Sequence, residues 1–108
     1  MVYVDDMYLY PVGQFRNMKM SHLIADTTEE LLRMVDKIGV QRKWIQHKGT
    51  GQEHFDIAQT KREKAIKAGA RPITYRQCGC MCTRRDFTGR LGDPETAERW
   101  VHAAIGLL

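Results

Sequence analysis

The chain of 108 residues has no long apolar run, and no segment approaches the roughly 18 consecutive apolar residues that a membrane-spanning helix needs. The first ten residues, MVYVDDMYLY, carry acidic side chains where a secretory signal carries basic ones, and no small-residue cleavage site follows. We therefore expect a cytosolic protein with no membrane partner. Apolar residues make up 43% and charged residues 28%, which is typical of a globular protein, and the length predicts one small domain over residues 1–108. A homo-oligomer is compatible with so small a core.

Several catalytic and nucleotide-binding motifs are absent. The glycine-rich segment GTG lacks the Lys-Ser/Thr ending of a Walker loop, and the glycine fingerprint of dinucleotide-binding proteins does not occur. Ser21 is the only serine, and its neighbour His22 would point to the opposite face of a strand. The chain also lacks the Gly-x-Ser-x-Gly turn of such hydrolases. Both observations argue against a serine hydrolase.

Cysteine is scarce, and the three present, Cys78, Cys80 and Cys82, are odd in number. In a reducing compartment they are not expected to form a disulfide framework. Zinc sites usually use Cys-x-x-Cys pairs with further ligands elsewhere, so the alternate spacing argues against zinc. On a strand the three thiols would share one side, and we interpret them as a buried or half-buried strand face.

Hydrophobic patterns predict strands that alternate with helices. A capping box, Thr27 with Glu30, starts a helix that Gly39 ends, and a second box, Thr60 with Glu63, starts another. A third helix is expected after Asp93, with Pro94 at its first position. The pattern predicts an α/β fold, one small domain with a short mixed sheet and about three helices. Strands are expected at residues 1–5, 21–27, 40–49 and 71–77, an extended stretch at 54–57, and loops at 8–20 and 83–92.

Three segments carry a resemblance to a known family: VYVDD at the start, MSHLIADTTEELLRMVDKIGV, and HFDIAQTKREKAIKAGARPITYR. In this order they resemble the bacterial and phage family called domain of unknown function 4031, over roughly residues 1–76. The family usually has tyrosine where Phe55 stands here. The resemblance implies no established activity, although short phage-borne members make an accessory or counter-defence role the natural expectation.

The candidate site residues lie at predicted strand ends and before the second helix. His22, Asp26, His54 and Asp56, with Asp5 at another strand end, form an imidazole and carboxylate set of the kind that binds a divalent metal. Alternation around Phe55 puts His54 and Asp56 on one face. Without a metal, the same pair would contact a ligand oxygen directly. The full set of expected ligand-binding residues is His22, Asp26, Trp44, His54, Asp56, Lys61 and Arg62.

The net charge of +4 and the basic start of the second helix favour a phosphate-bearing ligand. The first hypothesis is a module that binds a nucleotide or another phosphorylated small molecule through Lys61 and Arg62, with Trp44, Tyr8 or Tyr10 stacking on it. Such a module could sequester a nucleotide signal. The alternative is a metal-assisted phosphoesterase or nuclease, and nucleic acid is a compatible partner. A third hypothesis is a protein-interaction factor that uses Arg84, Arg85 and Arg90.

Overall fold

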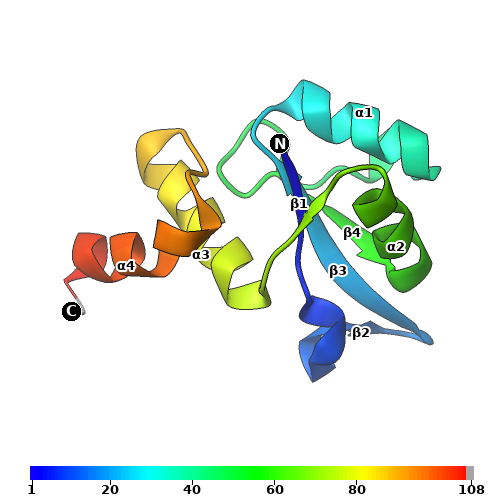
Figure 1. The fold of residues 1–108 in the computed structure, drawn as a ribbon, viewed down its shortest axis with the longest axis horizontal. Coiled ribbons are helices and arrows are strands. Elements are labelled where there is room, and N and C mark those ends of the chain that lie inside the picture. Colours follow the sequence, from blue (N-terminus) through cyan, green and yellow to red (C-terminus); the bar gives the residue numbers. More distant parts are fainter. Residues whose placement is uncertain (107–108) are drawn as a thin grey trace.

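The computed structural model describes residues 1–106, and it has a mixed sheet of five strands with helices against both faces (Figure 1). The α/β class expected from the sequence is confirmed. Three short 3-10 turns are η1 (Met7–Leu9), η2 (Pro11–Gly13) and η3 (Arg42–Trp44). The strands and α-helices, in chain order, are β1 (Val2–Val4), β2 (Gln14–Phe15), β3 (Met18–Ala25), α1 (Thr28–Ile38), β4 (Phe55–Ala58), α2 (Gln59–Lys67), β5 (Arg71–Pro72), α3 (Tyr75–Thr88) and α4 (Pro94–Ile105).

Strand β3 organises the sheet because three other strands pair with it, all of them antiparallel. Strand β1 lies along one side of β3 and pairs in parallel with β5 on its other side. Strand β4 lies along the opposite side of β3, in a register that sets His22 directly across from Asp56. This register places two polar residues side by side on one face of the sheet.

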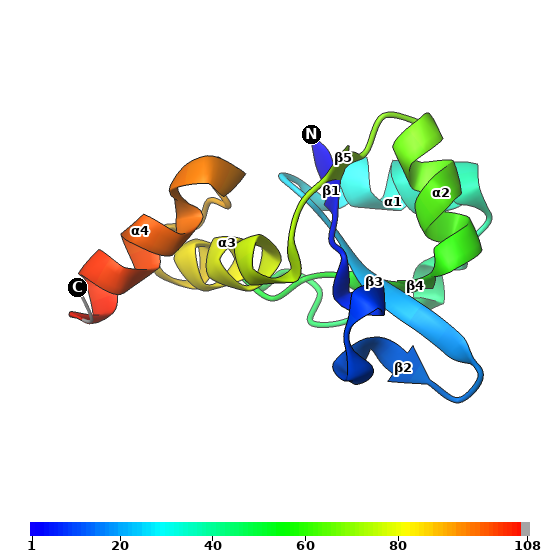
Figure 2. The ribbon, with the colours of Figure 1, turned by 60° about the horizontal axis from the view of Figure 1, so that its bottom comes forward.

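The two faces of the sheet are covered unequally. On one face Leu23 and Ala25 of β3, with Phe55 and Ile57 of β4, pack under α1 and α2 and form the larger core. On the other face Tyr3 and Ile24 pack against α3 and α4 in a second, smaller core. Figure 2 shows α1 and α2 on one side of the sheet and the α3–α4 pair displaced toward one end. The remainder of that second face, where His22 and Asp56 lie, stays partly open to solvent.

Helix α1 follows the sequence prediction closely. The Thr27 hydroxyl accepts a hydrogen bond from the backbone amide of Glu30, and Gly39 ends the helix in the left-handed conformation at φ 80°. Leu31 and Val35 are fully buried under the sheet. The third expected helix is also confirmed, because α4 begins at Pro94 after Asp93, although the Asp93 side chain makes no capping hydrogen bond.

Two predictions around β4 are wrong. Residues 40–49 form no strand; the segment contains η3, and its Trp44 side chain is 61% exposed rather than packed in a core. Helix α2 begins at Gln59 directly after Ala58, and no side chain caps it, so the Thr60–Glu63 box does not form. Pairing with β3 keeps β4 extended as far as Ala58. Helix α2 starts at the next residue, so Thr60 lies inside the helix and not at its N-cap.

The cysteine segment is helical, which corrects the strand expected over 71–77 and the loop expected over 83–92. Only Arg71 and Pro72 pair with β1, and α3 then runs from Tyr75 to Thr88. Thr74 and Gln77 form a full capping box, in which each side chain accepts from the backbone amide of the other. The three cysteines therefore lie on a helix, where Cys78 and Cys82 are one turn apart and Cys80 is not on their face.

The stretch expected as a loop over residues 8–20 is more ordered than predicted. Turns η1 and η2 lead into a hairpin in which Phe15 pairs with Met18 across the two-residue turn Arg16–Asn17. Arg16 adopts a positive φ of 56°, which such a tight turn requires. Strand β3 accordingly begins at Met18, three residues earlier than expected.

Within residues 1–106, none of the helices combines the length and the apolar character needed to cross a bilayer.

Candidate metal centre

Two paired strands bring the polar cluster together. His22 of β3 and Asp56 of β4 face each other in the sheet register, and His54 lies just before β4. Phe55 between the last two points into the larger core, so His54 and Asp56 project from the opposite face. The alternation predicted from the sequence is therefore observed, and β3 adds His22 to the same face.

Three ligand-type atoms converge on one point. Oδ1 of Asp56 lies 3.6 Å from Nε2 of His22 and 3.5 Å from Nε2 of His54. One possible ligand atom from each of the three residues lies within 4.8 Å of those from the other two. Zinc–ligand bonds of about 2.0–2.2 Å in tetrahedral geometry imply separations of roughly 3.3–3.6 Å between ligand atoms. The spacing around Asp56 fits that requirement before any side chain moves.

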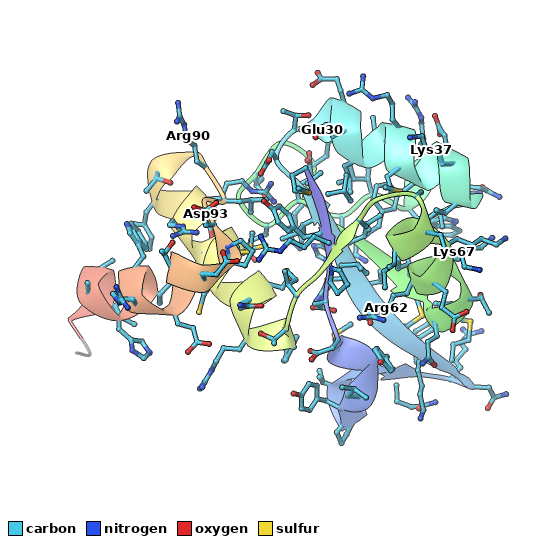
Figure 3. The ribbon with its side chains drawn as sticks, in the orientation of Figure 1. Glu30, Lys37, Arg62, Lys67, Arg90 and Asp93 are labelled. Atoms are coloured by element: carbon cyan, nitrogen blue, oxygen red, sulfur yellow. The ribbon has the colours of Figure 1, made fainter. Side chains whose placement is uncertain are left out.

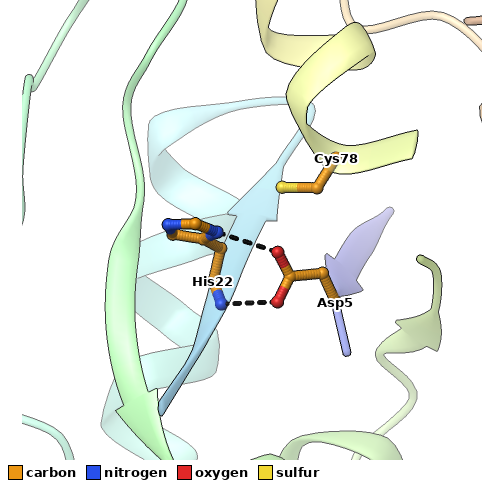
Figure 4. Close-up of side chains that lie close together, drawn as sticks. All are labelled: Asp5, His22 and Cys78. Atoms are coloured by element: carbon orange, nitrogen blue, oxygen red, sulfur yellow. Dashed lines mark hydrogen bonds and ion pairs between the residues drawn. The ribbon is translucent and has the colours of Figure 1, made fainter. Parts of the chain in front are cut away.

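Asp5 fixes the orientation of the His22 ring (Figure 4). Its carboxylate is fully buried; Oδ2 accepts from Nδ1 of His22 at 2.8 Å, while Oδ1 accepts from the backbone amides of His22 and Met7. Nδ1 therefore carries the proton, and Nε2, at the far end of the ring from Asp5, presents a lone pair. A carboxylate behind a histidine in this way is the usual partner of a metal-binding imidazole.

The His54 ring is oriented in the same sense by a different partner. Its Nδ1 lies 2.6 Å from the backbone carbonyl oxygen of Gln52, which can only accept a hydrogen bond, so Nδ1 is the protonated nitrogen. Both Nε2 atoms then direct lone pairs toward Oδ1 of Asp56. Among residues 1–106 this oxygen is buried and has no hydrogen-bond partner, whereas Oδ2 accepts from Gln46 at 2.8 Å. Three acceptors that face one another require a cation, either a proton or a metal ion.

The pKa shifts of the cluster reflect this crowding. Burial by itself lowers the pKa of His54, but the Asp56 carboxylate and the Gln52 carbonyl outweigh it, and the pKa is raised. Burial raises the pKa of Asp56, yet His54 and the Gln46 amide outweigh it and the pKa is lowered. The 3.5 Å contact between these two residues is an ion-pair distance, longer than an ordinary hydrogen bond. Without a metal, a proton shared with His54 satisfies part of the charge on Asp56.

A second group of ligand atoms lies behind His22, where Asp5 and Cys78 approach the ring (Figure 4). Both Asp5 oxygens are already engaged by hydrogen bonds, and the pKa of Cys78 is raised well above its usual value by its hydrogen bond with Cys82 and by burial. A protonated thiol is a poor metal ligand. This inner group therefore supports the His22 ring, and the outer group is the better metal site.

A cavity of about 490 Å³ opens beside the histidines, and we call it the histidine cavity. Helix α3 forms its wall opposite the sheet and contributes Cys82, whose pKa is lowered to about 7 by the Cys78 thiol and by the nearby Arg85 guanidinium, against the effect of burial. Tyr75 stacks on the His22 ring at 5.9 Å between centroids. The remaining lining includes Arg76, Gln52 and Ile24. Two of the three residues that would hold a cation, His22 and His54, therefore line this cavity.

Several residues expected in the site lie elsewhere. Asp26 is half-exposed and forms an ion pair with the Met1 amino group at 3.3 Å. Arg62 donates from Nε to the backbone carbonyl of Asp5 and lies over the Tyr8 ring, beside the segment that follows β1 (Figure 3). Lys61 extends toward Gly39 at the end of α1. Lys61 and Arg62 are thus directed toward the end of α1 and toward the segment after β1, and neither side chain is part of the cluster of His22, His54 and Asp56.

The basic residues of the interaction hypothesis are mostly engaged within the chain. Buried Arg84 donates to the carbonyls of Leu91 and Asp93 and to the Thr96 hydroxyl. Arg85 donates to three backbone carbonyls, those of Gly51, Ala25 and Glu53. Only Arg90 of the three is exposed. The first two arginines hold helices and loops together rather than forming a free basic surface.

Sequence reasoning missed the groups contributed by α3 and by the segment before β4. Tyr75 and Arg76 fell in a stretch interpreted as a strand, which hid their position at the mouth of the histidine cavity. The capping box at Thr74 and Gln77 was the signal that could have revealed this helix. Gln52 acts through its backbone carbonyl, and no side-chain pattern encodes that contact.

The comparisons with known proteins bear on the chain as a whole. A family model described as "Protein of unknown function (DUF4031)" matches residues 2–85. The match includes β1, β3, β4 and nearly all of α3, and so every residue of the metal centre and of the histidine cavity. No curated protein and no solved structure matches the chain.

Proposed function

Because the chain belongs to the DUF4031 family, whose description assigns no activity, we propose a function from its own geometry: a metal-dependent phosphoesterase. One divalent cation is held between His22, His54 and Asp56. The observation that carries the proposal is the buried Oδ1 of Asp56, which lies 3.6 Å from Nε2 of His22 and 3.5 Å from Nε2 of His54 and has no hydrogen-bond partner in residues 1–106. Two imidazoles and one carboxylate suit Zn²⁺, Mn²⁺ or Fe²⁺.

The choice of phosphate esters rests on the net charge of the chain and on the position of Arg76. The chain carries a net charge of +4, and the exposed guanidinium of Arg76 lies at the cavity mouth, with Glu98 4.0 Å away as its only ion-pair partner in residues 1–106. A bound cation supplies Lewis-acid chemistry and lowers the pKa of water. Arg76 neutralises a non-bridging phosphate oxygen. A water oxygen bonds to phosphorus, the ester P–O bond breaks, and the departing alcohol oxygen takes up the proton released by the water.

The first test is metal binding by protein purified without a histidine tag. After treatment with EDTA, titration with Zn²⁺, Mn²⁺ or Co²⁺ should give one equivalent bound, and Co²⁺ should produce the visible absorption of a histidine-ligated ion. His22→Ala and Asp56→Ala should each lose this binding. His102→Ala, in an exposed histidine of α4, is the matched control and should bind as the parent protein does. A parent protein that binds no cation in stoichiometric amount would sink the proposal.

The second test is turnover. The metal-loaded protein should hydrolyse bis(p-nitrophenyl) phosphate or p-nitrophenyl phosphate, and EDTA should stop the reaction. Arg76→Gln should reduce the rate and leave the metal affinity unchanged, because Arg76 contacts substrate and not the cation. Metal binding without hydrolysis of either ester would remove the enzymatic part of the proposal.

A second candidate is the metal-free nucleotide-binding module, for which the aromatic residues at the cavity mouth are the supporting observation. Tyr75 stacks on His22 and also contacts Tyr10, with 5.9 Å between ring centroids in both pairs. A nucleobase can extend such a stack while Arg76 contacts a phosphate. Thermal stabilisation by nucleotides that persists in EDTA favours this candidate, whereas stabilisation that needs the cation favours the phosphoesterase.

A further inference from the structure

A second concavity adjoins the metal centre at Asp56, and we call it the aromatic groove. It has a volume of about 780 Å³. One wall is the β2–β3 hairpin with Phe15 and Met18, and the other is η3 with Trp44. Asp56 lines the groove as well, so one carboxylate belongs both to the metal centre and to this groove.

The large apolar side chains of the groove are left in solvent. Trp44 is 61% exposed, Phe15 is 53% exposed and Met18 is 44% exposed. Apolar side chains gathered in this way commonly mark a binding surface. Trp44 lies in the segment predicted to be a strand and is one of the residues expected to stack on a ligand, and neither core of the sheet includes it.

Each aromatic ring of the groove carries a cation of its own. The Arg16 guanidinium carbon lies 5.4 Å from the Phe15 ring centroid, and Nζ of Lys43 lies 5.0 Å from the Trp44 ring centroid. Within residues 1–106 neither cation forms an ion pair with a carboxylate. The groove therefore combines two aromatic rings with two positive charges, and Asp56 is the only acidic residue of its lining in the described part of the chain.

We infer that the aromatic groove binds single-stranded nucleic acid and delivers it to the metal centre, which specifies the substrate class of the proposed phosphoesterase and rests on that function. Aromatic rings that stack unpaired bases, beside cations that contact phosphates, are the common means of holding single strands. A duplex buries its base faces in its own stack and cannot present them to Phe15 and Trp44. A purely apolar protein partner would leave Arg16 and Lys43 without anionic partners.

The position of Asp56 links the groove to hydrolysis. In the proposed complex, bases stack on Trp44 and Phe15 while phosphates lie beside Lys43 and Arg16. Asp56 lines the same groove, and it is this residue that connects the groove to the cation site. In cleavage the water oxygen joins that phosphorus, one P–O bond to a sugar oxygen breaks, and the sugar oxygen leaves as a hydroxyl. The groove thus selects the polymer and the metal centre acts on it.

Fluorescence anisotropy with labelled oligothymidylate and oligouridylate of about 12 nucleotides tests the inference, and the two probes separate DNA from RNA. The titrations are made in EDTA, so binding is measured without the cation. Trp44→Ala and Phe15→Ala should each weaken binding by about 5- to 100-fold. Lys43→Gln should lower the slope of log affinity against log salt by about 0.7, because one phosphate contact is lost.

Matched substitutions outside the groove serve as controls. Phe87 of α3 is 67% exposed and Lys67 of α2 is exposed, so Phe87→Ala and Lys67→Gln remove the same kinds of side chain elsewhere. Both should bind the probes as the parent protein does. Trp44→Phe should restore most of the affinity lost in Trp44→Ala, which separates stacking from any change in folding. Equal binding of a matched duplex, or equal affinity in the groove and control variants, would overturn the inference.

The two proposals can fail independently. Trp44→Ala should bind the cation and hydrolyse p-nitrophenyl esters like the parent protein, while His54→Ala, which alters the metal centre but not the groove lining, should still bind oligonucleotides. If the protein hydrolyses small esters but binds neither oligonucleotide, the substrate inference falls and the phosphoesterase stands. If it binds oligonucleotides but no cation, the groove stands as a binding site and the phosphoesterase falls.

Discussion

At the scale of single residues, Asp5 has the most exacting environment in the molecule. It is fully buried, and its two oxygens accept three hydrogen bonds, one of them from the His22 ring. A buried carboxylate without partners is costly, and here the partners are two backbone amides and an imidazole. Asp5 therefore stabilises the end of β1 and at the same time determines which nitrogen of His22 faces Asp56.

Asp5→Asn should weaken metal binding while leaving the protein folded. The amide oxygen can still accept from the His22 and Met7 amides, but the new NH₂ group donates to Nδ1 of His22 and forces the proton onto Nε2. Loss of such a supporting carboxylate typically lowers metal affinity by about 10- to 100-fold. Isothermal titration with Zn²⁺ measures the change. Asp36→Asn, which alters an exposed ion pair with Arg42, should have no effect, and an unchanged affinity in Asp5→Asn would contradict the assigned role.

The raised pKa of His54 predicts opposite pH trends for the metal-free and metal-loaded protein. The stability that protonated His54 gains from Asp56 is complete below its ordinary pKa of 6.5 and is lost as the pH rises through the folded value. The pKa of Asp56 is lowered, so its stabilisation of the folded state is present above its ordinary pKa of 3.8 and is lost as the pH falls through the folded pKa. Metal binding needs the neutral ring, so affinity rises over the range where metal-free stability declines.

Thermal unfolding between pH 5.5 and 8.5, a range chosen to span about one unit below and two above the usual histidine pKa, measures both trends. The increase in Tm on adding Zn²⁺ should grow with pH. The titratable groups facing His54 are His22, Asp56, His47 and Cys82. His47→Ala should keep the pH dependence of the Zn²⁺-induced Tm increase, which shows that the His47 ring does not cause it. A Zn²⁺-induced shift that is constant with pH would be inconsistent with a histidine-held cation.

At the scale of elements, the segment between η3 and β4 lies close against α3, and Gly51 allows this approach because it has no side chain. A Cβ on Gly51 would lie 2.5 Å from the backbone nitrogen of Asp86, so only glycine allows the two backbones to approach this closely. The Gly51 carbonyl in turn accepts from Arg85. Because Gln52 and His54 follow directly, this contact also fixes one edge of the metal centre.

Gly51→Ala should destabilise the protein by about 1–3 kcal/mol and weaken metal binding, because the segment has to move away from α3. Urea denaturation and Zn²⁺ titration measure the two effects. Gly79→Ala is the control: a Cβ there meets nothing within 4 Å, and alanine in a helix should stabilise by about 0.5–1 kcal/mol. Equal stability of the two variants would show that the close approach carries no energetic weight.

Elements differed in how well the sequence predicted them, for identifiable reasons. Helix α1 has a cap, a periodic apolar face and a terminal glycine, and all three agree. Helix α3 has few apolar residues at helical spacing, and the alternation of Cys78, Cys80 and Cys82 imitates a strand. In the site, His54 and Asp56 followed from local alternation, whereas the approach of His22 depends on the pairing of β3 with β4. Asp26 instead meets the Met1 amino group and Lys61 extends toward Gly39, contacts that no local pattern encodes. Local pattern determined which faces are polar, and strand pairing determined which of them meet.

At the scale of the whole molecule, the two cores on opposite sides of the sheet are unequal. Helices α1 and α2 cover the larger core, while α4 packs mainly on α3, with Ala97 and the preceding Leu91 buried in the smaller core. It also forms an exposed ion pair between Glu95 and Arg71 of β5. Arg84 ties α4 to α3 through the Asp93 carbonyl and the Thr96 hydroxyl. An element attached through one neighbour opens more readily than one packed on several.

Hydrogen exchange followed by mass spectrometry should therefore show α4 exchanging faster than β3 or α1. Arg84→Met should accelerate exchange in α4 further, because it removes the ties to residues 91–96 while its chain still fills the buried site. Exchange in β3 should change little. Arg99→Met, at an exposed position of α4, is the control and should leave the exchange of α4 unchanged. Simultaneous exchange of α4 and β3 in the parent protein would show a single cooperative unit instead.

The pairing of His22 with Asp56 across β3 and β4 has a consequence for how quickly the centre fills. Both positions are set by the hydrogen-bond ladder of the sheet, so no segment has to order itself around an arriving ion. Filling is then limited by the rate at which the ion sheds its own water shell. Mg²⁺, which dehydrates reluctantly and prefers six oxygen ligands, should enter slowly and hold poorly, while Zn²⁺ should load within the mixing time of a stopped-flow experiment. On the proposed function, a site that is already formed would therefore discriminate among divalent ions by how fast each one loses its water.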